Sequence, residues 1–402
     1  MFVQHLQEYV NKADAIGTKP RAPRKRVTFL LEKSLTPQGL ESDDAIELLN
    51  AALQEDQQEL IKDFAAQLRR PRPKDILLLP PLYFTSRCEN KCVYCDFSSR
   101  GTRLSQREFL DEMKALLDMG YRSIELVSSQ DPELFIKDAA YSPHNQVFDI
   151  QKVVDYFNLA RAELNARGGG MLTSNIPPVD LNSLKSLKAA GLDCFLLWVE
   201  TFHPAQYQKL HSNQGPKFNQ WFRIRSYEAA LAAGIGHVAG AFLKGLYDWR
   251  KEEFLLYELD RHLRTRTGKG FSIIGTPRLK GPYLKTRLVA PYRVADADYE
   301  LNIALDRILF DGLIWLQTRE TPALNRRLID RYGAGVVLTL DCSTAPGGYS
   351  QQSQRRAQFP VFRQNLNAAV ADLENQGYSV IFNWSAETLS SFLRNRGPDT
   401  HG

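Results

Sequence analysis

Short apolar segments alternate with helical segments eight times along the chain, and this alternation limits the possible folds more than any other feature. Each apolar segment has the length and composition of a strand, and each helical segment repeats its apolar residues at helical spacing. The predicted strands span residues 76–84, 123–128, 170–175, 194–200, 237–243, 271–275, 313–318 and 336–340. Such units predict an α/β protein with a parallel sheet, and eight of them predict a (β/α)8 TIM-type barrel. An open doubly wound sheet is the alternative, but the cofactor fingerprint that it usually carries is absent.

Further segments flank the predicted barrel. We expect an N-terminal arm and helical extension at 1–75, the barrel at 76–345, and a C-terminal helix and cover segment at 346–402. Residues 1–26 are polar and end in a basic run, which favours a solvent-exposed arm over a partner-binding patch. Helical spacing predicts a helix over 42–68 with Ser42 as its N-cap, followed by a proline-containing linker at 69–73. After the barrel we predict a helix within 351–377 and a short strand at 378–382.

Three of the five cysteines follow the first predicted strand at the spacing C-x3-C-x2-C, and Tyr94 precedes the last of them. They are Cys88, Cys92 and Cys95. Thiolates are the usual ligands of iron–sulfur clusters, and three of them on a [4Fe–4S] cluster leave one iron open to a small molecule. Barrel enzymes have their active sites at the carboxyl ends of the strands, where this loop begins. A zinc site is the alternative, but zinc usually takes four ligands in paired spacings, and the other two cysteines, Cys194 and Cys342, are single and distant.

Composition adds mainly exclusions. The hydrophobic fraction of 43% and the charged fraction of 24% are ordinary for a soluble enzyme. The net charge of +5 is too small to indicate a nucleic-acid partner by itself. No apolar run has transmembrane length or the character of a signal peptide, and five cysteines indicate a reducing interior. We therefore expect a cytoplasmic protein without a membrane or nucleic-acid partner.

The cysteine spacing and the aromatic residue before the third cysteine resemble the radical S-adenosylmethionine (radical SAM) superfamily. Further stretches, in order after the cysteine loop, resemble its aromatic amino-acid lyases, which include 2-iminoacetate synthase (the tyrosine lyase of thiamine biosynthesis) and related tyrosine and tryptophan lyases. The stretches are ETFH at 200–203, QGPK at 214–217, LKGLYDW at 243–249, TPRL at 276–279, TRE at 318–320 and PGGY at 346–349. Each is weak alone, and their order strengthens them together.

The resemblance implies roles for individual residues. The three cysteines would ligate a [4Fe–4S] cluster whose open iron binds SAM. Arg278 would pair with the carboxylate of the substrate, for which a bidentate guanidinium is suited. Arg223 and Glu200 would complete the catalytic pocket. The residues expected to contact SAM are Tyr94, Gln130, Asn175, Glu200 and Arg319.

The implied activity is that of a carbon–carbon lyase that uses radical chemistry. An electron donor such as flavodoxin or ferredoxin would reduce the cluster, SAM would be cleaved, and the 5′-deoxyadenosyl radical would take a hydrogen from the amino group of an aromatic amino acid. With tyrosine, the family products are p-cresol and 2-iminoacetate. Two departures leave the substrate open: Ser129-Gln130 stands where the family usually has Gly-Glu, and Lys280 replaces a second arginine. Two alternatives therefore remain, a radical SAM enzyme for another small amino-acid-like substrate and a cluster-binding protein that does not cleave SAM.

Overall fold

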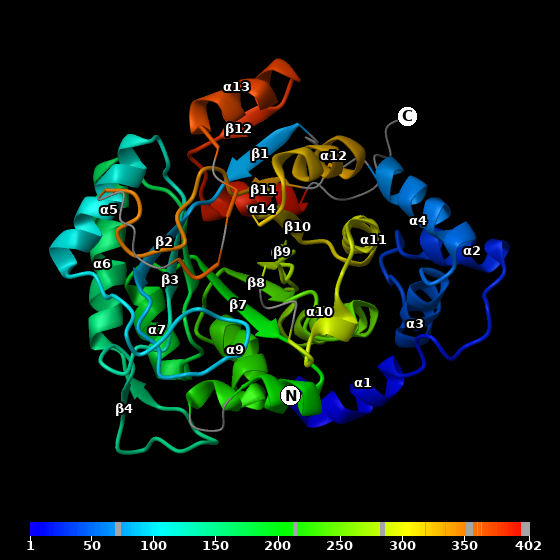
Figure 1. The fold of residues 1–402 in the computed structure, drawn as a ribbon, viewed down its shortest axis with the longest axis horizontal. Coiled ribbons are helices and arrows are strands. Elements are labelled where there is room, and N and C mark those ends of the chain that lie inside the picture. The colour runs from blue at the N-terminus through cyan, green and yellow to red at the C-terminus, as the bar shows by residue number, and fades with distance from the viewer. Residues whose placement is uncertain are drawn as a thin grey trace.

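A single curled parallel sheet forms the centre of the protein (Figure 1). The computed structural model describes residues 1–68, 74–211, 215–281, 286–317, 319–333, 335–350, 357–359, 361–362 and 364–394. Within these residues the strand order is β12-β1-β11-β10-β9-β8-β7-β6-β3-β2. The strands are β1 (Asp75–Leu78), β2 (Pro81–Thr85), β3 (Ile124–Ser128), β6 (Leu172–Asn175), β7 (Cys194–Glu200), β8 (His237–Phe242), β9 (Ile273–Gly275), β10 (Leu313–Leu316), β11 (Val337–Leu338) and β12 (Ser379–Ile381).

The first predicted strand is divided into β1 and β2, and this division lies at the seam of the barrel. The amide of Leu79 donates to the carbonyl of Leu338 in β11 at 3.0 Å, whereas the carbonyl of Pro80 accepts from Glu125 in β3 at 3.0 Å. One bent segment thus bonds to β11 with its first half and to β3 with its second half. The prediction of an α/β TIM-type barrel is confirmed.

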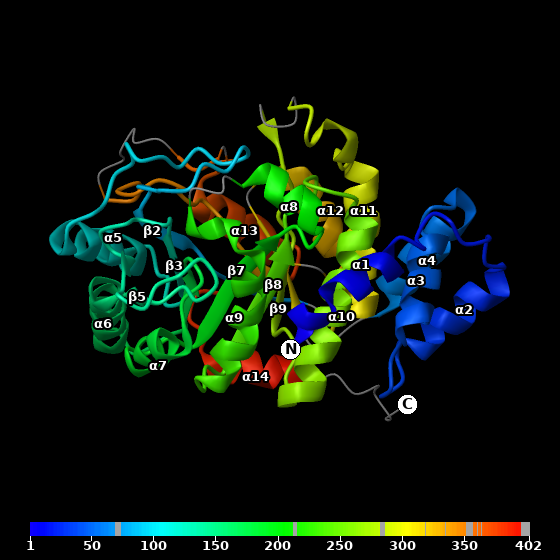
Figure 2. The same cartoon turned by 90° about the horizontal axis from the view of Figure 1, so that it is seen from below.

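Helices cover the outside of the sheet (Figures 1 and 2). The principal ones are α5 (Gln106–Asp118), α6 (Gln151–Ala166), α7 (Leu181–Ala189), α9 (Gln220–Ala232), α10 (Trp249–Thr267), α11 (Asp296–Leu309) and α12 (Pro322–Tyr332). The Ser105 and Glu108 side chains form a capping box at the start of α5, which satisfies amides that the helix leaves free. Loops after the strands carry the short helix α8 (Pro204–Leu210), the 3-10 helices η2 (Pro216–Phe218) and η4 (Ala290–Tyr292), and the hairpin of β4 (Ile136–Lys137) and β5 (Phe148–Asp149).

The N-terminal segment is not a solvent-exposed arm, contrary to the expectation. It forms the 3-10 helix η1 (Phe2–His5), α1 (Leu6–Ala13) and α2 (Arg24–Lys33), and α1 packs on α10. Phe2 and Leu6 are buried, because four-residue spacing places apolar side chains on one helix face. The helix predicted over 42–68 is two helices, α3 (Ser42–Ala51) and α4 (Glu55–Gln67), and Glu41 rather than Ser42 is the N-cap.

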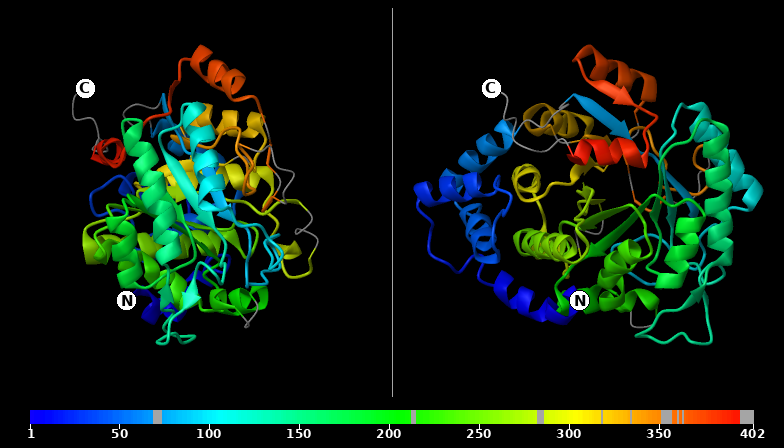
Figure 3. Two further views of the ribbon diagram at one scale, coloured as in Figure 1. Left: turned by 90° about the vertical axis from the view of Figure 1, so that its left-hand side faces the viewer. Right: turned by 180° about the vertical axis from the view of Figure 1, so that it is seen from behind.

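A C-terminal helix covers one end of the barrel. After α13 (Leu366–Asn375) and β12, α14 (Ala386–Arg394) lies across the amino-terminal ends of the strands (Figure 3). Trp384 and Leu389 are buried with the apolar barrel interior, and the Trp384 indole donates to the carbonyl of Leu78 at 2.8 Å. Figure 2 shows the loop after β2 at the opposite end, which leaves that end for a site.

The predicted helix within 351–377 is shorter than expected, because only α13 is helical among its described residues. Residues 351–356, 360 and 363 of that prediction, and the linker at 69–73, lie outside the described residues. Every helix in the described part of the chain is too short or too polar to span a bilayer.

Candidate active site

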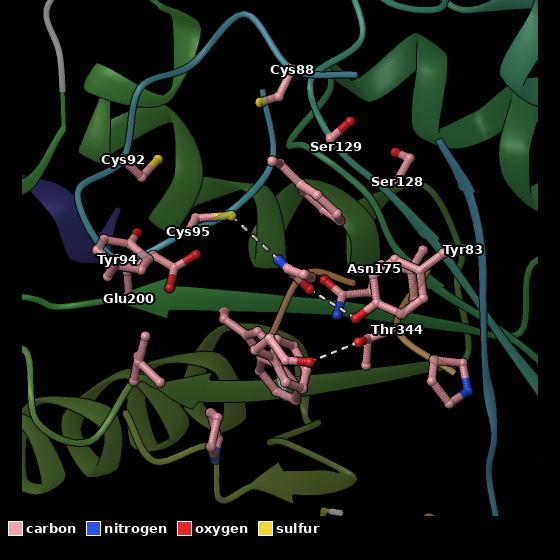
Figure 4. Close-up of a pocket in the computed structure, with 18 of the residues that line it drawn as sticks. Tyr83, Cys88, Cys92, Tyr94, Cys95, Ser128, Ser129, Asn175, Glu200 and Thr344 are labelled. Carbon is pink, nitrogen blue, oxygen red and sulfur yellow. Dashed lines mark hydrogen bonds between the residues drawn. The ribbon is translucent and has the colours of Figure 1, made fainter. Parts of the chain in front are cut away.

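A cavity lies at the carboxyl ends of the strands, and it collects most of the predicted site residues (Figure 4). The loop after β2 forms one side, and residues at the ends of β3, β6 and β7 form others. The predicted residues that line it are Cys88, Cys92, Tyr94, Cys95, Gln130, Asn175, Glu200, Arg223 and Arg319. Arg278 is the one predicted site residue that does not line this cavity.

The thiol loop is held in place by amide side chains. The Asn90 amide nitrogen contacts the Cys88 sulfur at 3.7 Å, and the Gln358 amide nitrogen contacts the Cys95 sulfur at 3.7 Å. Burial raises the pKa of all three cysteine thiols, to about 12 for Cys92, and the ammonium of Lys217 acts in the opposite direction. The loop thus places three thiols around one cavity beside a cation that favours their thiolate forms.

Tyr94 positions this loop through a buried histidine. Its hydroxyl lies 2.6 Å from Nε2 of His211, and Nδ1 of His211 lies 2.7 Å from the carbonyl of Tyr207. A carbonyl only accepts, so Nδ1 carries the proton and Nε2 accepts from Tyr94. Burial lowers the pKa of His211 to about 3, which keeps the ring neutral.

Glu200 carries charge into the cavity from a strained position. It ends β7 with a φ of 76°, in the left-handed region that non-glycine residues rarely adopt. Its carboxylate lies 2.6 Å from Nζ of Lys217 and 3.3 Å from Nη2 of Arg223, and Nε of Arg223 donates to the carbonyl of Trp198 at 2.7 Å. Burial acts to raise the pKa of Glu200, but Lys217 and Arg223 outweigh it, so the pKa lies below its usual value. Strain of this kind persists where surrounding contacts impose it, and it clusters at functional sites.

The floor of the cavity holds a second carboxyl group that the sequence analysis missed. Glu125 lies on β3, lines the cavity and is 4% exposed. Its Oε1 accepts a hydrogen bond from Nδ2 of Asn175 at 2.8 Å. Burial raises the pKa of Glu125 to about 7. The available signal was an acidic residue inside an otherwise apolar strand segment.

Arg278 does not line the cavity, and its pairing with a substrate carboxylate stays a prediction. Its Nε donates to Glu320 at 2.9 Å, its Nη2 to Asp296 at 2.8 Å and its Nη1 to the carbonyl of Val294 at 3.1 Å. Its side chain is 2% exposed. The guanidinium therefore pairs with buried Glu320 on one side and with exposed Asp296 on the other.

Alternation along the chain explains the direction of Arg278. The residues on either side, Pro277 and Leu279, line the cavity, and so does Lys280. Neighbouring side chains in an extended segment point to opposite faces, which agrees with the positions of Pro277, Arg278 and Leu279 but not with that of Lys280. Nζ of Lys280 reaches Glu320 at 2.5 Å.

Three buried polar atoms around the cavity have no hydrogen-bond partner among the described residues. They are Oγ of Ser128, Nε2 of Gln130 and Nε of Arg319. The Arg319 guanidinium also lies 3.5 Å from the ring centre of Phe359. A buried polar atom left unsatisfied costs about 1–3 kcal/mol, so these atoms are available to water or to a polar ligand in the cavity. Thr318 and Gln214, from two of the family-like stretches, lie outside the described residues.

Residues 82–256 match the family model of the radical SAM superfamily. These residues are therefore similar to a radical SAM domain. Over 360 residues the chain is 24% identical to 2-iminoacetate synthase of Escherichia coli (strain K12), covering 88% of this chain and 89% of that protein.

Two solved structures show the same fold. The [FeFe]-hydrogenase maturase HydG from Carboxydothermus hydrogenoformans superposes with a TM-score of 0.79 at 24% identity, covering 96% of this chain and 86% of HydG. Methylornithine synthase (PylB) superposes with a TM-score of 0.62 at 17% identity, covering 95% and 99%.

The site fits the groups that this superfamily uses, SAM and an iron–sulfur cluster. No set of three or more His, Cys, Asp or Glu in the described part of the chain is arranged to hold a metal ion. An iron–sulfur cluster does not need several ligands around one ion, because each thiolate binds a different iron. Cys88, Cys92 and Cys95 line one cavity together, as such a cluster requires. The unpartnered atoms of Ser128, Gln130 and Arg319 match the polar groups of an amino-acid-like cofactor.

Proposed function

We propose that the chain is a radical SAM carbon–carbon lyase that cleaves tyrosine between Cα and Cβ to p-cresol and 2-iminoacetate. The observation that carries the proposal is a single cavity that joins the thiol loop to charges of both signs and to aromatic walls. Similarity to 2-iminoacetate synthase over 88% of this chain supports the choice of substrate.

Different residues of the cavity would hold different groups. Cys88, Cys92 and Cys95 would hold a [4Fe–4S] cluster, and Gln130 and Arg319 would hold SAM. Together the bound cluster and SAM supply a carbon-centred radical that abstracts a hydrogen atom. An electron donor such as flavodoxin or ferredoxin, and a cytoplasmic location, stay predictions.

The chain's own charges suit an amino-acid zwitterion. The low pKa of Glu200 keeps it ionised at neutral pH, so it can accept hydrogen bonds from a substrate ammonium. Arg223 lies beside it and can pair with a substrate carboxylate, whereas Arg278 is already paired with Glu320. The indoles of Trp198 and Trp315, whose ring centres lie 5.7 Å apart, form an apolar wall that excludes water from the substrate.

The test uses anaerobically reconstituted protein reduced with dithionite and supplied with SAM and each aromatic amino acid in turn. Mass spectrometry measures 5′-deoxyadenosine and p-cresol. We expect tyrosine to increase 5′-deoxyadenosine and to yield p-cresol, and we expect neither product from a Cys92→Ser control. If 5′-deoxyadenosine forms while every aromatic amino acid survives, another amino-acid-like substrate replaces tyrosine. If SAM stays intact on a fully loaded cluster, the protein is not a SAM-cleaving enzyme.

A further inference from the structure

Glu125 occupies a position that the proposed chemistry does not use. It is an inward-facing residue of β3, and it pairs in register with Pro81 of β2 and Thr173 of β6. It lies three residues before Ser128 along the strand, which at about 3.3 Å per residue places it about 10 Å below the level of the strand ends. That depth is comparable to the long axis of an aromatic amino acid.

The surroundings of Glu125 do not compensate for a buried carboxyl group. Asn175 is its one hydrogen-bond partner among the described residues, and it contacts only Oε1. No ion pair involves Glu125 among the described residues. Burial is the main cause of its raised pKa, and the hydrogen bond from Asn175 acts in the opposite direction. A buried carboxyl without a full set of partners is costly. The apolar cluster of the barrel interior includes Leu196 and Trp315, and Trp315 also lines the cavity.

The cavity therefore changes character with depth. Its mouth carries the charged groups Glu200, Arg223 and Lys217, which suit the amino-acid end of a substrate. Its wall includes the indole of Trp198, and its floor carries the Glu125–Asn175 pair. A ligand that places its zwitterionic end at the mouth brings the far end of its side chain to Glu125.

We propose that Glu125, oriented by Asn175, is a specificity-determining residue that accepts a hydrogen bond from a donor at the far end of the substrate's aromatic ring. The cavity thereby selects a ring that carries a phenolic hydroxyl or a similar N–H donor over an unsubstituted ring. This inference rests on the proposed function for the class of substrate, but the selectivity belongs to binding and does not require turnover.

The experiment measures binding of ring-substituted amino acids to anaerobically reconstituted enzyme with SAM. Equilibrium dialysis compares tyrosine and 4-aminophenylalanine, which carry a donor, with phenylalanine and 4-methoxyphenylalanine, which do not. Sites built to bond a hydroxyl discriminate strongly against analogues that lack it. We expect the wild type to prefer tyrosine over phenylalanine, and Glu125→Leu to reduce this preference about 10- to 100-fold, the range for a hydrogen bond to a charged group.

Two further variants separate recognition from packing. Glu125→Gln keeps the shape and a hydrogen-bonding group, so we expect it to retain part of the preference. Val127→Ala changes the volume of the same wall without changing its polarity, so we expect it to alter the binding of tyrosine and phenylalanine by similar factors. Iron content and the 5′-deoxyadenosine formed without substrate report whether each variant is folded and loaded.

The outcomes distinguish this inference from the proposed function. In one outcome the wild type binds tyrosine selectively, Glu125→Leu loses this selectivity, and the wild type forms no p-cresol. That result supports recognition by Glu125 and refutes the lyase activity. Formation of p-cresol with the same tyrosine preference in wild type and Glu125→Leu refutes the role of Glu125. If Glu125→Leu does not fold, two other results together refute the role of Glu125. The first is an unchanged tyrosine preference in Glu125→Gln, and the second is equal binding of tyrosine and 4-methoxyphenylalanine by the wild type.

Discussion

Replacement of Lys217 by methionine tests the electrostatics of the cavity wall most directly. Nζ of Lys217 lies 2.6 Å from Oε1 of Glu200, and the two side chains are 16% and 9% exposed. Methionine keeps most of the side-chain volume and removes the charge. Breaking a buried pair by removing one partner costs about 3–5 kcal/mol. Because Arg223 still lies 3.3 Å from Glu200, we expect a loss of about 2–3 kcal/mol in the free energy of unfolding.

The pH dependence of this loss has a definite sign. In the wild type the pKa of Glu200 lies below its usual value, so Glu200 contributes stability above its unfolded pKa of about 4.3 and loses that contribution as the pH falls through the folded pKa. Without Lys217, burial moves the folded pKa upward, and the ionised carboxylate becomes unfavourable at neutral pH. The difference in stability between wild type and Lys217→Met is therefore largest near neutral pH and shrinks as the pH falls.

Urea unfolding followed by circular dichroism measures this difference at several pH values, on iron-free protein so that cluster loss does not contribute. Thermal unfolding supplies a second measure. The unfolding entropy of a 402-residue chain is about 0.8 kcal/mol/K, so the melting temperature should fall by about 3 °C. The matched control is Lys251→Met, which removes an exposed pair with Asp14 at 2.7 Å and should cost less than about 1 kcal/mol. Equal losses in the two variants, or a loss that grows toward acidic pH, would refute the reasoning.

Three further predictions concern the loop and the pairs around the site. Gly215→Ala would place a Cβ against Oδ1 of Asn90, so the Asn90 side chain must shift from its contacts with Lys217 and Cys88, and the iron content of reconstituted protein should fall. Cys95→Ser should leave the circular dichroism spectrum unchanged while abolishing the visible absorbance of the cluster, and retained absorbance would remove Cys95 from the ligand set. Arg278→Met leaves Glu320 buried with fewer partners and should lower the free energy of unfolding by about 3 kcal/mol in urea, while the tyrosine KM stays within a few-fold of wild type. A large rise in KM with unchanged stability would restore Arg278 as a substrate ligand.

The barrel and the thiol loop could be predicted because their signals are local. A buried parallel strand is a short apolar run whatever its partners, and eight runs separated by amphipathic helices have few ways to pack. Cys88, Cys92 and Cys95 lie within eight consecutive residues after a strand, so their meeting needs only one loop. The polar residues at the strand ends could also be predicted, since parallel strands direct their carboxyl ends to one side.

The errors occurred where a long-range contact decides the structure. The N-terminal helix α1 buries Leu6 only because α10 lies beside it, so a polar composition concealed a packed face. Trp384, just before helix α14, and Leu389 within it are buried in the barrel interior, and Trp384 bonds to Leu78, 306 positions earlier in the chain. The sequence motif singled out Arg278 as a substrate ligand, but it could not state which face of the segment the residue occupies.

By itself the sequence determined the α/β architecture, the position of the thiol loop and the chemical family, because periodicity and cysteine spacing are properties of neighbouring residues. Only the tertiary structure decided the direction and pairing of the charged side chains. Glu200 gains its low pKa from Lys217 and Arg223, Arg278 faces Glu320 and Asp296, and Glu125 meets Asn175 at the floor of the cavity. These pairs join different strands and loops, and the electrostatic energy of a buried charge depends on which partners the fold brings within a few ångströms.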